Sequence, residues 1–334
     1  MIDVLALGEL LIDFTHYGES ETGMRLFEQN PGGAPANVLS ALSRLGRSTA
    51  FIGKVGQDMH GEFLYAALSR EGIDLTGLMK TDEAFTTLAF VELSHGERRF
   101  SFARKPGADT CLRPEDVKRE LIESAKVFHF GSLSLTHEPA RTATLHAVRT
   151  AKHNGSIISY DPNYRAVLWS SQKQAVQQMR SVLEYIDMIK ISDEETALLT
   201  DREDPEDAAR YLAEKGIPCV VVTLGKKGAL ACLNNKITTA GIVEADVVDT
   251  TGAGDAFWGG FLHRFFDTGK RPDALLIEEV RDCLVFGNTT AALCVRRRGA
   301  IPAMPSLDEA TALYNSIKES NQVLNPKGVN TVQS

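Results

Sequence analysis

Short apolar runs alternate along the chain with longer amphipathic segments. The apolar runs are almost continuous, which is typical of strands that helices cover on both faces. They fall at residues 4–7, 49–52, 157–160, 188–191 and 220–224. This alternation predicts an α/β protein with a doubly wound, mostly parallel sheet.

The amphipathic segments are predicted to be helices that pack on this sheet. In residues 36–45, one face carries Val38, Ala41, Leu42 and Leu45, and Gly46 follows as a terminator. Residues 61–71 and 206–215 have a similar pattern. We therefore expect a helix in each of these ranges.

Two segments depart from this pattern. Residues 14–30 and 85–105 alternate polar and apolar positions, and His95-Gly96 marks a turn in the second. Hairpins of this kind fit poorly inside a parallel sheet, so we expect a small β-sheet lid beside the core. Residues 1–319 then form one domain that includes the lid, and the polar, aperiodic residues 320–334 are expected to form a flexible tail.

Polar clusters come directly after several predicted strands. They comprise Glu9 with Asp13, residues 161–163, residues 192–195 and residues 223–225. Strands that simply end in polar turns explain one or two of these clusters. The whole set favours a shared site, because ligands of open parallel sheets bind at the carboxyl edge of the strands.

The charge balance argues against several classes of partner. The chain of 334 residues has a net charge of −8 and a pI of about 5.6, whereas nucleic acids and anionic membranes select basic surfaces. The short basic run 296–298 is interpreted as a cluster at a helix C-terminus. No apolar run approaches the roughly 20 residues needed to cross a bilayer. We expect no nucleic-acid partner and no membrane partner.

The N-terminus and the cysteines indicate a compartment. The first residues carry carboxylates and lack the basic stretch of a secretory signal peptide. The five cysteines are scattered without a C-x-x-C pair, which argues against a zinc site or a disulfide framework. Cys219 and Cys232 flank an apolar strand and are interpreted as core residues. The expected location is a reducing cytoplasm.

The segment 249–261, DTTGAGDAFWGGF, combines a small-residue turn with a carboxylate. It is predicted to join a strand to a helix, so Gly252, Ala253 and Gly254 lie at a helix N-terminus. Unpaired N–H groups and the helix dipole favour an anion there, and small residues allow it to approach closely. Neither the P-loop pattern nor the glycine pattern of a dinucleotide loop is present.

Asp255 follows the turn directly. An Asp at this position also serves simply as a helix-start residue, which the dipole favours. That explanation leaves the three small residues unexplained. If the N–H groups hold a transferring phosphoryl group, Asp255 is placed to accept the proton of the attacking hydroxyl, and the dipole is expected to keep it ionised. Phosphoryl transfer tolerates such a weak base, because positioning and charge neutralisation provide most of the catalysis. The sequence predicts a phosphotransferase.

With these residues in view, the chain resembles the ribokinase-like carbohydrate kinases, and most closely their fructokinase branch, over about residues 4–306. The segments PGGAPANVLSALSRLG and DTTGAGDAF resemble the two family motifs, and GKVGQDMHG and VVVTLGKKGA stand in the expected order. The resemblance implies a three-layer α/β/α core with a β-sheet lid. It also implies ATP-dependent phosphorylation of a sugar hydroxyl, with Asp255 as the base and residues 252–254 as the anion hole.

The resemblance assigns further residues to the two substrates. The sugar-binding residues it implies are Asp13, Gly32, Gly33 and Asn37, a set of groups suited to paired hydroxyls, while an Asn at the start of a helix is also unremarkable. For the nucleotide it implies Ser192, Thr223, Gly225, Gly228 and, near the adenine, Asn288.

It also implies cations. Mg²⁺ is expected on the phosphates, mostly through water, with Glu195 at the acidic position of a motif in which Ser192 replaces the usual asparagine. An ordinary acidic first turn of a helix explains Glu195 as well. Asp249 and Thr251, together with backbone oxygens of Arg297 and Gly299, match the two loops that hold K⁺ in many relatives. Ala303 stands where some relatives have a hydroxyl residue.

Two segments bear on the identity of the sugar. DPNYRAVLW, residues 161–169, resembles the fructokinase and ketodeoxygluconate kinase branches, with Arg165 facing a substrate or phosphate oxygen and Asn163 orienting the loop. In residues 98–109, strand alternation places Phe100, Phe102 and Arg104 on one face, either closing over the sugar or packing within the lid. Fructose, phosphorylated at its 6-hydroxyl, is favoured, while 2-keto-3-deoxygluconate and aminoimidazole riboside remain open.

Two alternatives of other classes remain. A non-catalytic sugar or nucleotide sensor on the same core has no need of Asp255, and an oxidoreductase would require a glycine-rich dinucleotide loop after the first strand. Exposed lid strands can pair between subunits, so a homodimer through the lid is expected.

Overall fold

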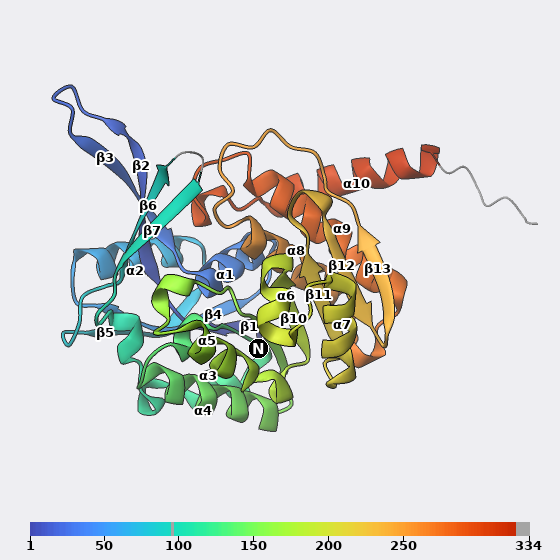
Figure 1. Cartoon of the computed structure of the whole chain (residues 1–334), viewed down its shortest axis with the longest axis horizontal. Coiled ribbons are helices and arrows are strands. Elements are labelled where there is room, and N and C mark those ends of the chain that lie inside the picture. Colours follow the sequence, from blue (N-terminus) through green and yellow to red (C-terminus); the bar gives the residue numbers. More distant parts are fainter. Residues whose placement is uncertain (95–96, 325–334) are drawn as a thin grey trace, which may run out of the picture.

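The computed structural model describes residues 1–94 and 97–324, with the side chains of 92–100 and 321–324 excepted. It contains a large mixed sheet, a small second sheet and helices on both faces of the large one (Figure 1). The His95-Gly96 turn lies outside the described residues.

The large sheet has nine strands in the order β13-β12-β11-β10-β9-β8-β1-β4-β5. All neighbours pair in parallel except at the edge formed by β12 and β13, where the pairing is antiparallel. The strands are β1 (Ile2–Leu7), β4 (Thr49–Gly56), β5 (Asp74–Thr81), β8 (Ala125–Gly131), β9 (Ile157–Asp161), β10 (Met188–Ser192), β11 (Cys219–Thr223), β12 (Ala229–Leu233) and β13 (Lys236–Ala240). Each of the five strand predictions overlaps one of these strands, and the expectation of a mostly parallel sheet is confirmed.

Two hydrophobic clusters cover the faces of this sheet. On one face the strands pack on α1 (Ala34–Arg44), α2 (Met59–Arg70), α8 (Ala253–Asp267) and α9 (Ile277–Cys294). The other face is covered by α3 (Arg119–Glu123), α4 (Ala140–His153), α5 (Gln172–Arg180), α6 (Thr196–Thr200) and α7 (Pro205–Glu214). Side chains that alternate along a strand therefore enter different clusters, as with Met188 and Ile189 of β10. This produces the three layers expected from the sequence.

The second sheet is the predicted lid. Its order is β3-β2-β6-β7, formed by β2 (Leu11–Glu19), β3 (Arg25–Gly32), β6 (Leu88–Ser94) and β7 (Glu97–Ala103). The β2–β3 hairpin projects beyond the rest of the molecule in Figure 1. Because β2 follows β1 after only a few residues and β3 leads into α1, the lid is continuous with the sheet edge at which polar residues gather.

The C-terminal helix is longer than expected. We expected residues 320–334 to lack regular structure, but α10 (Leu307–Leu324) extends into this stretch. Residues 325–334 lie outside the described residues. Within the described residues, no helix combines the length and the apolar character needed to cross a membrane.

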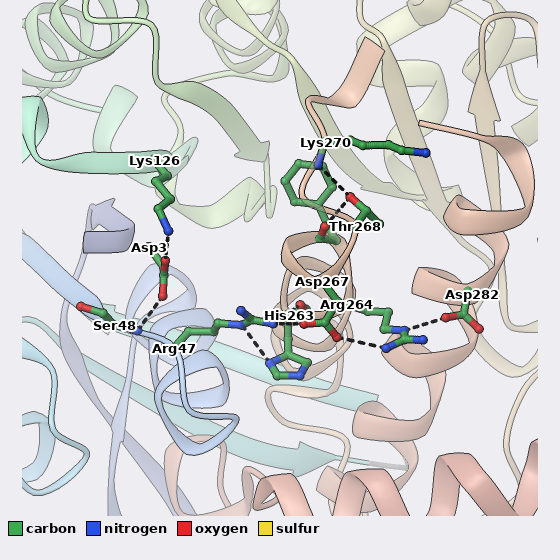
Figure 2. A network of polar contacts seen from close by, with 11 residues as sticks. Asp3, Arg47, Ser48, Lys126, His263, Arg264, Asp267, Thr268, Lys270 and Asp282 are labelled. Atoms are coloured by element: carbon green, nitrogen blue, oxygen red, sulfur yellow. Dashed lines mark hydrogen bonds and ion pairs between the residues drawn. The ribbon is translucent and has the colours of Figure 1, made fainter. Parts of the chain in front are cut away.

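A polar network fixes α8 at its C-terminal end (Figure 2). Arg47 donates to the carbonyl of His263 at 2.8 Å and also pairs with Asp267, and Arg264 donates to Asp282 of α9 at 2.6 Å. Nearby, Lys126 and the N–H of Ser48 both bond Asp3 of β1. At the end remote from Asp255, α8 is thus tied to the segment between α1 and β4 and to α9.

Candidate active site

One cavity brings together most of the residues that the sequence assigned to catalysis and to the sugar. Its volume is about 200 Å³, below the roughly 300–1,000 Å³ of pockets that enclose drug-sized ligands. Its lining residues are Glu9, Leu11, Asp13, Gly33, Ala34, Asn37, Val91, Phe102, Leu133, Asn163, Arg165 and residues 250–255. They come from the carboxyl edge of the large sheet, the starts of α1 and α8, and the lid. Of the polar clusters that follow strands, Glu9 with Asp13 and the segment 161–163 reach this cavity.

The start of α8 has the geometry of an anion site. Gly252 has φ 75°, a conformation that favours glycine, and no side chain caps the helix. The N–H of Ala253 donates to the carbonyl of Thr250 at 3.3 Å, and the helical ladder begins with Ala256 on Gly252. In the described part of the chain, the N–H groups of Gly254 and Asp255 have no protein acceptor. They are free to bind an anion in the cavity.

Asp255 lies on the first turn of α8 and lines the cavity. Its Oδ2 accepts a hydrogen bond of 2.8 Å from the amide of Asn37 on α1, 218 positions away. Burial, followed by the nearby carboxylate of Asp161, raises the pKa of Asp255 to about 6. We expected Asp255 to be ionised and a weak base; a pKa of about 6 leaves it mostly ionised at pH 7 but makes it a stronger base than expected.

The double glycine before α1 places its backbone against β1 and the lid. Gly33 has φ 118°, and a Cβ there would lie 2.4 Å from the carbonyl oxygen of Glu9. A Cβ on Gly32 would lie 2.2 Å from Oδ2 of Asp13. Any larger residue would displace these groups, so the motif is needed for the close approach of backbone and carboxylate.

Glu9 lines the same cavity, although the sequence analysis assigned it no role beyond its place after the first strand. Its Oε1 accepts the N–H of Ala34 at 3.0 Å, and its buried Oε2 has no partner among the described residues. Burial raises the pKa of Glu9 to about 7. A carboxyl after a strand was the only sequence signal for this residue.

Arg104, which the sequence placed either over the sugar or in the packing of the lid, does not line the cavity. Strand β7 ends one residue earlier, and the guanidinium is buried against Asp109, with Nη2–Oδ2 at 2.6 Å. It also donates to Thr136 at 2.9 Å and to the carbonyl of Leu133 at 3.0 Å. Its donors are occupied in joining the lid to the core. Phe102 does line the cavity, whereas the side chain of Phe100 lies outside the described residues.

The residues assigned to the nucleotide follow the carboxyl edge away from the cavity. Ser192 and Thr223 are register partners at the ends of β10 and β11. Gly225 and Gly228 have φ values of 54° and 92°, and a Cβ on Gly228 would lie 2.2 Å from the carbonyl of Ala240. A depression of about 570 Å³ lies beside this loop. It is lined by Lys226, Ile242, Glu244, Ala245, Asp246, Val247 and Arg296.

Asn288 and Glu195 are engaged by protein groups. The amide of Asn288 donates to the carbonyls of Ala240 and Gly241 at 3.1 and 2.9 Å, so it holds the end of β13 against α9. Glu195 accepts the N–H groups of Ser192 and Tyr164 at 2.8 and 2.6 Å. Among the described residues, no group of three or more His, Cys, Asp or Glu side chains is arranged to hold a metal ion.

The two loops assigned to K⁺ lie side by side. One oxygen of Asp249 accepts the N–H and hydroxyl of Thr251 at 2.9 and 2.7 Å, and the other accepts the N–H of Gly299 at 3.0 Å. The side chain of Arg297 forms an ion pair with Glu309. Only the backbone of Arg297 was assigned to the cation, and this ion pair does not involve it. Asp249 thus couples the anion-hole turn to the loop after α9.

The fold and site define a carbohydrate kinase, and comparison with known proteins places the chain in a family. The profile of the pfkB family carbohydrate kinases matches residues 1–307, and the chain belongs to this family. It is 42% identical over 323 residues to "Probable fructokinase-3" of Arabidopsis thaliana, covering 95% of this chain and 92% of the relative. The expected family and fold are confirmed.

Solved structures give the same result. The fructokinase of Xylella fastidiosa with bound ATP superimposes with a TM-score of 0.88 at 33% identity, covering 95% of this chain and 99% of the other. A double mutant of the Vibrio cholerae O395 fructokinase, in a fructose-, ADP- and potassium-bound form, gives 0.84 at 32% identity, with 94% and 98% covered. The protein is therefore a sugar kinase with a ribokinase-like fold.

Proposed function

We propose that the protein is an ATP-dependent fructokinase that phosphorylates the 6-hydroxyl of fructose, with Asp255 as the base. The observation that carries this proposal is the meeting, in one cavity, of Asp255 with the unpaired N–H groups at the start of α8. The similarity to proteins named fructokinases favours fructose as the acceptor.

The sugar is held between the core and the lid. Asp13 and Asn37 face the cavity with a carboxylate and an amide, which suit paired hydroxyls, and the backbone of Gly33 admits the ring. Phe102 and Val91 of the lid cover it with apolar surface. Closing a site in this way excludes water, which would otherwise compete for the phosphoryl group.

The transfer itself is an in-line displacement. The 6-hydroxyl gives its proton to Asp255 while its oxygen bonds to the γ-phosphorus of ATP, and the bond to the β–γ bridging oxygen breaks to release ADP. The N–H groups of Gly254 and Asp255, with Arg165 opposite, stabilise the charge on the migrating group. A pKa of about 6 leaves Asp255 mostly ionised at pH 7 and still able to hold a proton.

The residues for the donor and the cations fit what bound ATP requires. The loop from Thr223 to Gly228 and the depression beside Lys226 provide room for the nucleotide. Mg²⁺ on the phosphates would supply charge neutralisation, with Glu195 at the edge to hold its waters. K⁺ would be held near Asp249, where it supports the anion-hole turn. We place the enzyme in a reducing compartment, the cytoplasm, in keeping with its five free cysteines.

The lid also supports a homodimer. Its exposed apolar side chains include Tyr17, Met24, Leu26, Phe27 and Phe90, a concentration that favours association. Light scattering after gel filtration tests this: the dimer mass is expected, and a monomer at micromolar concentration would contradict it.

The function is tested with a panel of sugars in the presence of ATP and Mg²⁺. Fructose, 2-keto-3-deoxygluconate and aminoimidazole riboside are compared by ADP release, and the position of the phosphate is read from the ³¹P–¹H couplings of the product. The highest kcat/KM is expected for fructose, with phosphate on oxygen 6. Turnover of another sugar alone would reassign the acceptor, and binding without ADP formation would indicate a sensor.

A further inference from the structure

A second buried ion pair lies behind the start of α8, and the sequence assigned no role to its lysine, Lys190. Lys190 of β10 and Asp161 at the end of β9 are 6% and 2% exposed, and Nζ lies 2.5 Å from Oδ2. Both side chains are on the face of the sheet that packs on α8, since Ile189 and Ile191 enter the opposite cluster. The pair therefore faces the helix that carries Asp255.

The ammonium group lies directly against the anion-hole turn. A Cβ built on Gly254 would lie 3.5 Å from Nζ of Lys190 and 3.6 Å from its Cε. Lys190 is not among the residues that line the cavity, whereas Gly254 is. The backbone of Gly254 therefore separates the positive charge of Lys190 from the cavity.

We propose that Lys190 is a positioning residue for phosphoryl transfer: held by Asp161, its ammonium adds fixed positive charge behind the N–H groups of Gly254 and Asp255. This deepens the proposed function and rests on it. A charge fixed in a dry site acts without reorganisation when the phosphoryl group migrates. The same charge favours the ionised form of the base, opposing Asp161, which disfavours it.

The charges around Asp255 determine the direction in which each substitution shifts its pKa. Desolvation and Asp161 raise the pKa of Asp255, and Lys190 lowers it. The polar, titratable and charged groups around Asp255 come from several elements. They are Asp161 of β9, Arg165 of the loop after β9, Lys190 of β10, Asn37 of α1, Cys294 of α9, and Glu9 and Asp13 in the lining of the cavity. Removing Lys190 is therefore expected to raise the pKa of Asp255, and removing Asp161 is expected to lower it.

The test compares K190M and D161N with a matched control. In K190M, kcat is expected to fall about tenfold or more, because one stabilising charge is lost, while the KM for fructose changes less than about twofold, because the sugar does not touch Lys190. The acid limb of the kcat profile is expected to move to higher pH in K190M and to lower pH in D161N, each by about half a unit or more.

Lys54 provides the control. It is also buried, and its Nζ lies 2.5 Å from Asp116, but it is not among the residues that line the cavity. K54M is expected to lower the melting temperature while kcat and the acid limb stay at the wild-type values. K190Q provides a second variant if K190M does not fold.

The outcomes separate this proposal from the proposed function. If the wild type does not phosphorylate fructose, the function is wrong, whatever the variants do. If the wild type is active, a folded K190M or K190Q with wild-type kcat overturns the proposal. So do shifts of the acid limb in the same direction in K190M and D161N, or a profile for K54M that matches that of K190M.

Discussion

Two buried ion pairs in this molecule have similar chemistry and different consequences. Arg104–Asp109 joins the lid to the core, and every partner of Arg104 is a protein group. Lys190–Asp161 faces the start of α8, where the N–H groups of Gly254 and Asp255 have no acceptor within the described residues. Where protein groups satisfy every donor of a buried pair, loss of one partner costs stability; beside unsatisfied N–H groups, the same kind of charge can also act on a ligand.

The largest effect is expected for Asp255, which lies beside only one of the two ion pairs, Lys190–Asp161. D255N removes the proton acceptor, so kcat for fructose should fall about 10²–10⁴-fold, while fructose still binds. At pH 7 the ionised form of Asp255 is destabilised by burial, because its folded pKa lies above the unfolded value. The melting temperature of D255N is therefore expected to equal or exceed that of the wild type. Steady-state kinetics, calorimetry with fructose and thermal unfolding check this, and a fully active D255N would remove the base from the mechanism.

The next effect concerns stability. R104M leaves Asp109 buried without its partner, which should lower the free energy of unfolding by about 3–5 kcal/mol. Because Arg104 does not line the cavity, the kcat of the folded enzyme should stay close to wild type. Urea unfolding and activity per folded molecule are the measurements. A loss of fructose affinity at unchanged stability would restore Arg104 to the sugar site.

A smaller effect is the pH dependence of the wild type. Asp255 accepts a proton only when ionised, and its pKa is about 6. The rate should be nearly constant above pH 7 and should fall about tenfold for each pH unit well below 6. A kcat profile between pH 4.5 and 8.5 checks the limb, with unfolding measured in parallel. An acid limb near pH 4 would mean that burial has little influence on this carboxyl.

The smallest effect is expected for N37A. Asn37 donates to Asp255 at 2.8 Å and lowers its pKa, so its removal should shift the acid limb upward by about half a unit. The KM for fructose should also rise, since the amide faces the cavity. The control is Asn30, which bonds lid residues and does not line the cavity. If N30A and N37A behave alike, the role of Asn37 is structural.

Much of the fold was predictable because it follows from local patterns. Apolar runs without alternation indicated strands buried on both faces, and polar alternation identified the lid. The strands that the patterns missed are β5, β8, β12 and β13. In β13 only Ala240 is buried, so too few residues carry the signal. The helical residues 320–324 were also missed, because Ser320, Asn321 and Gln322 are polar and so short a stretch shows no apolar period.

The features of the site also divide into those set by local sequence and those set by tertiary contacts. By itself, the sequence determined the small-residue turn at the start of α8, the carboxylate behind it and the glycines at positive φ, since these depend on residues close together in the chain. Only the tertiary structure decided the partners and the charge state: Asn37 on Asp255, Lys190 on Asp161, and Arg104 turned into the core. Those facts depend on which side chains distant in sequence meet, and on how much water their packing removes.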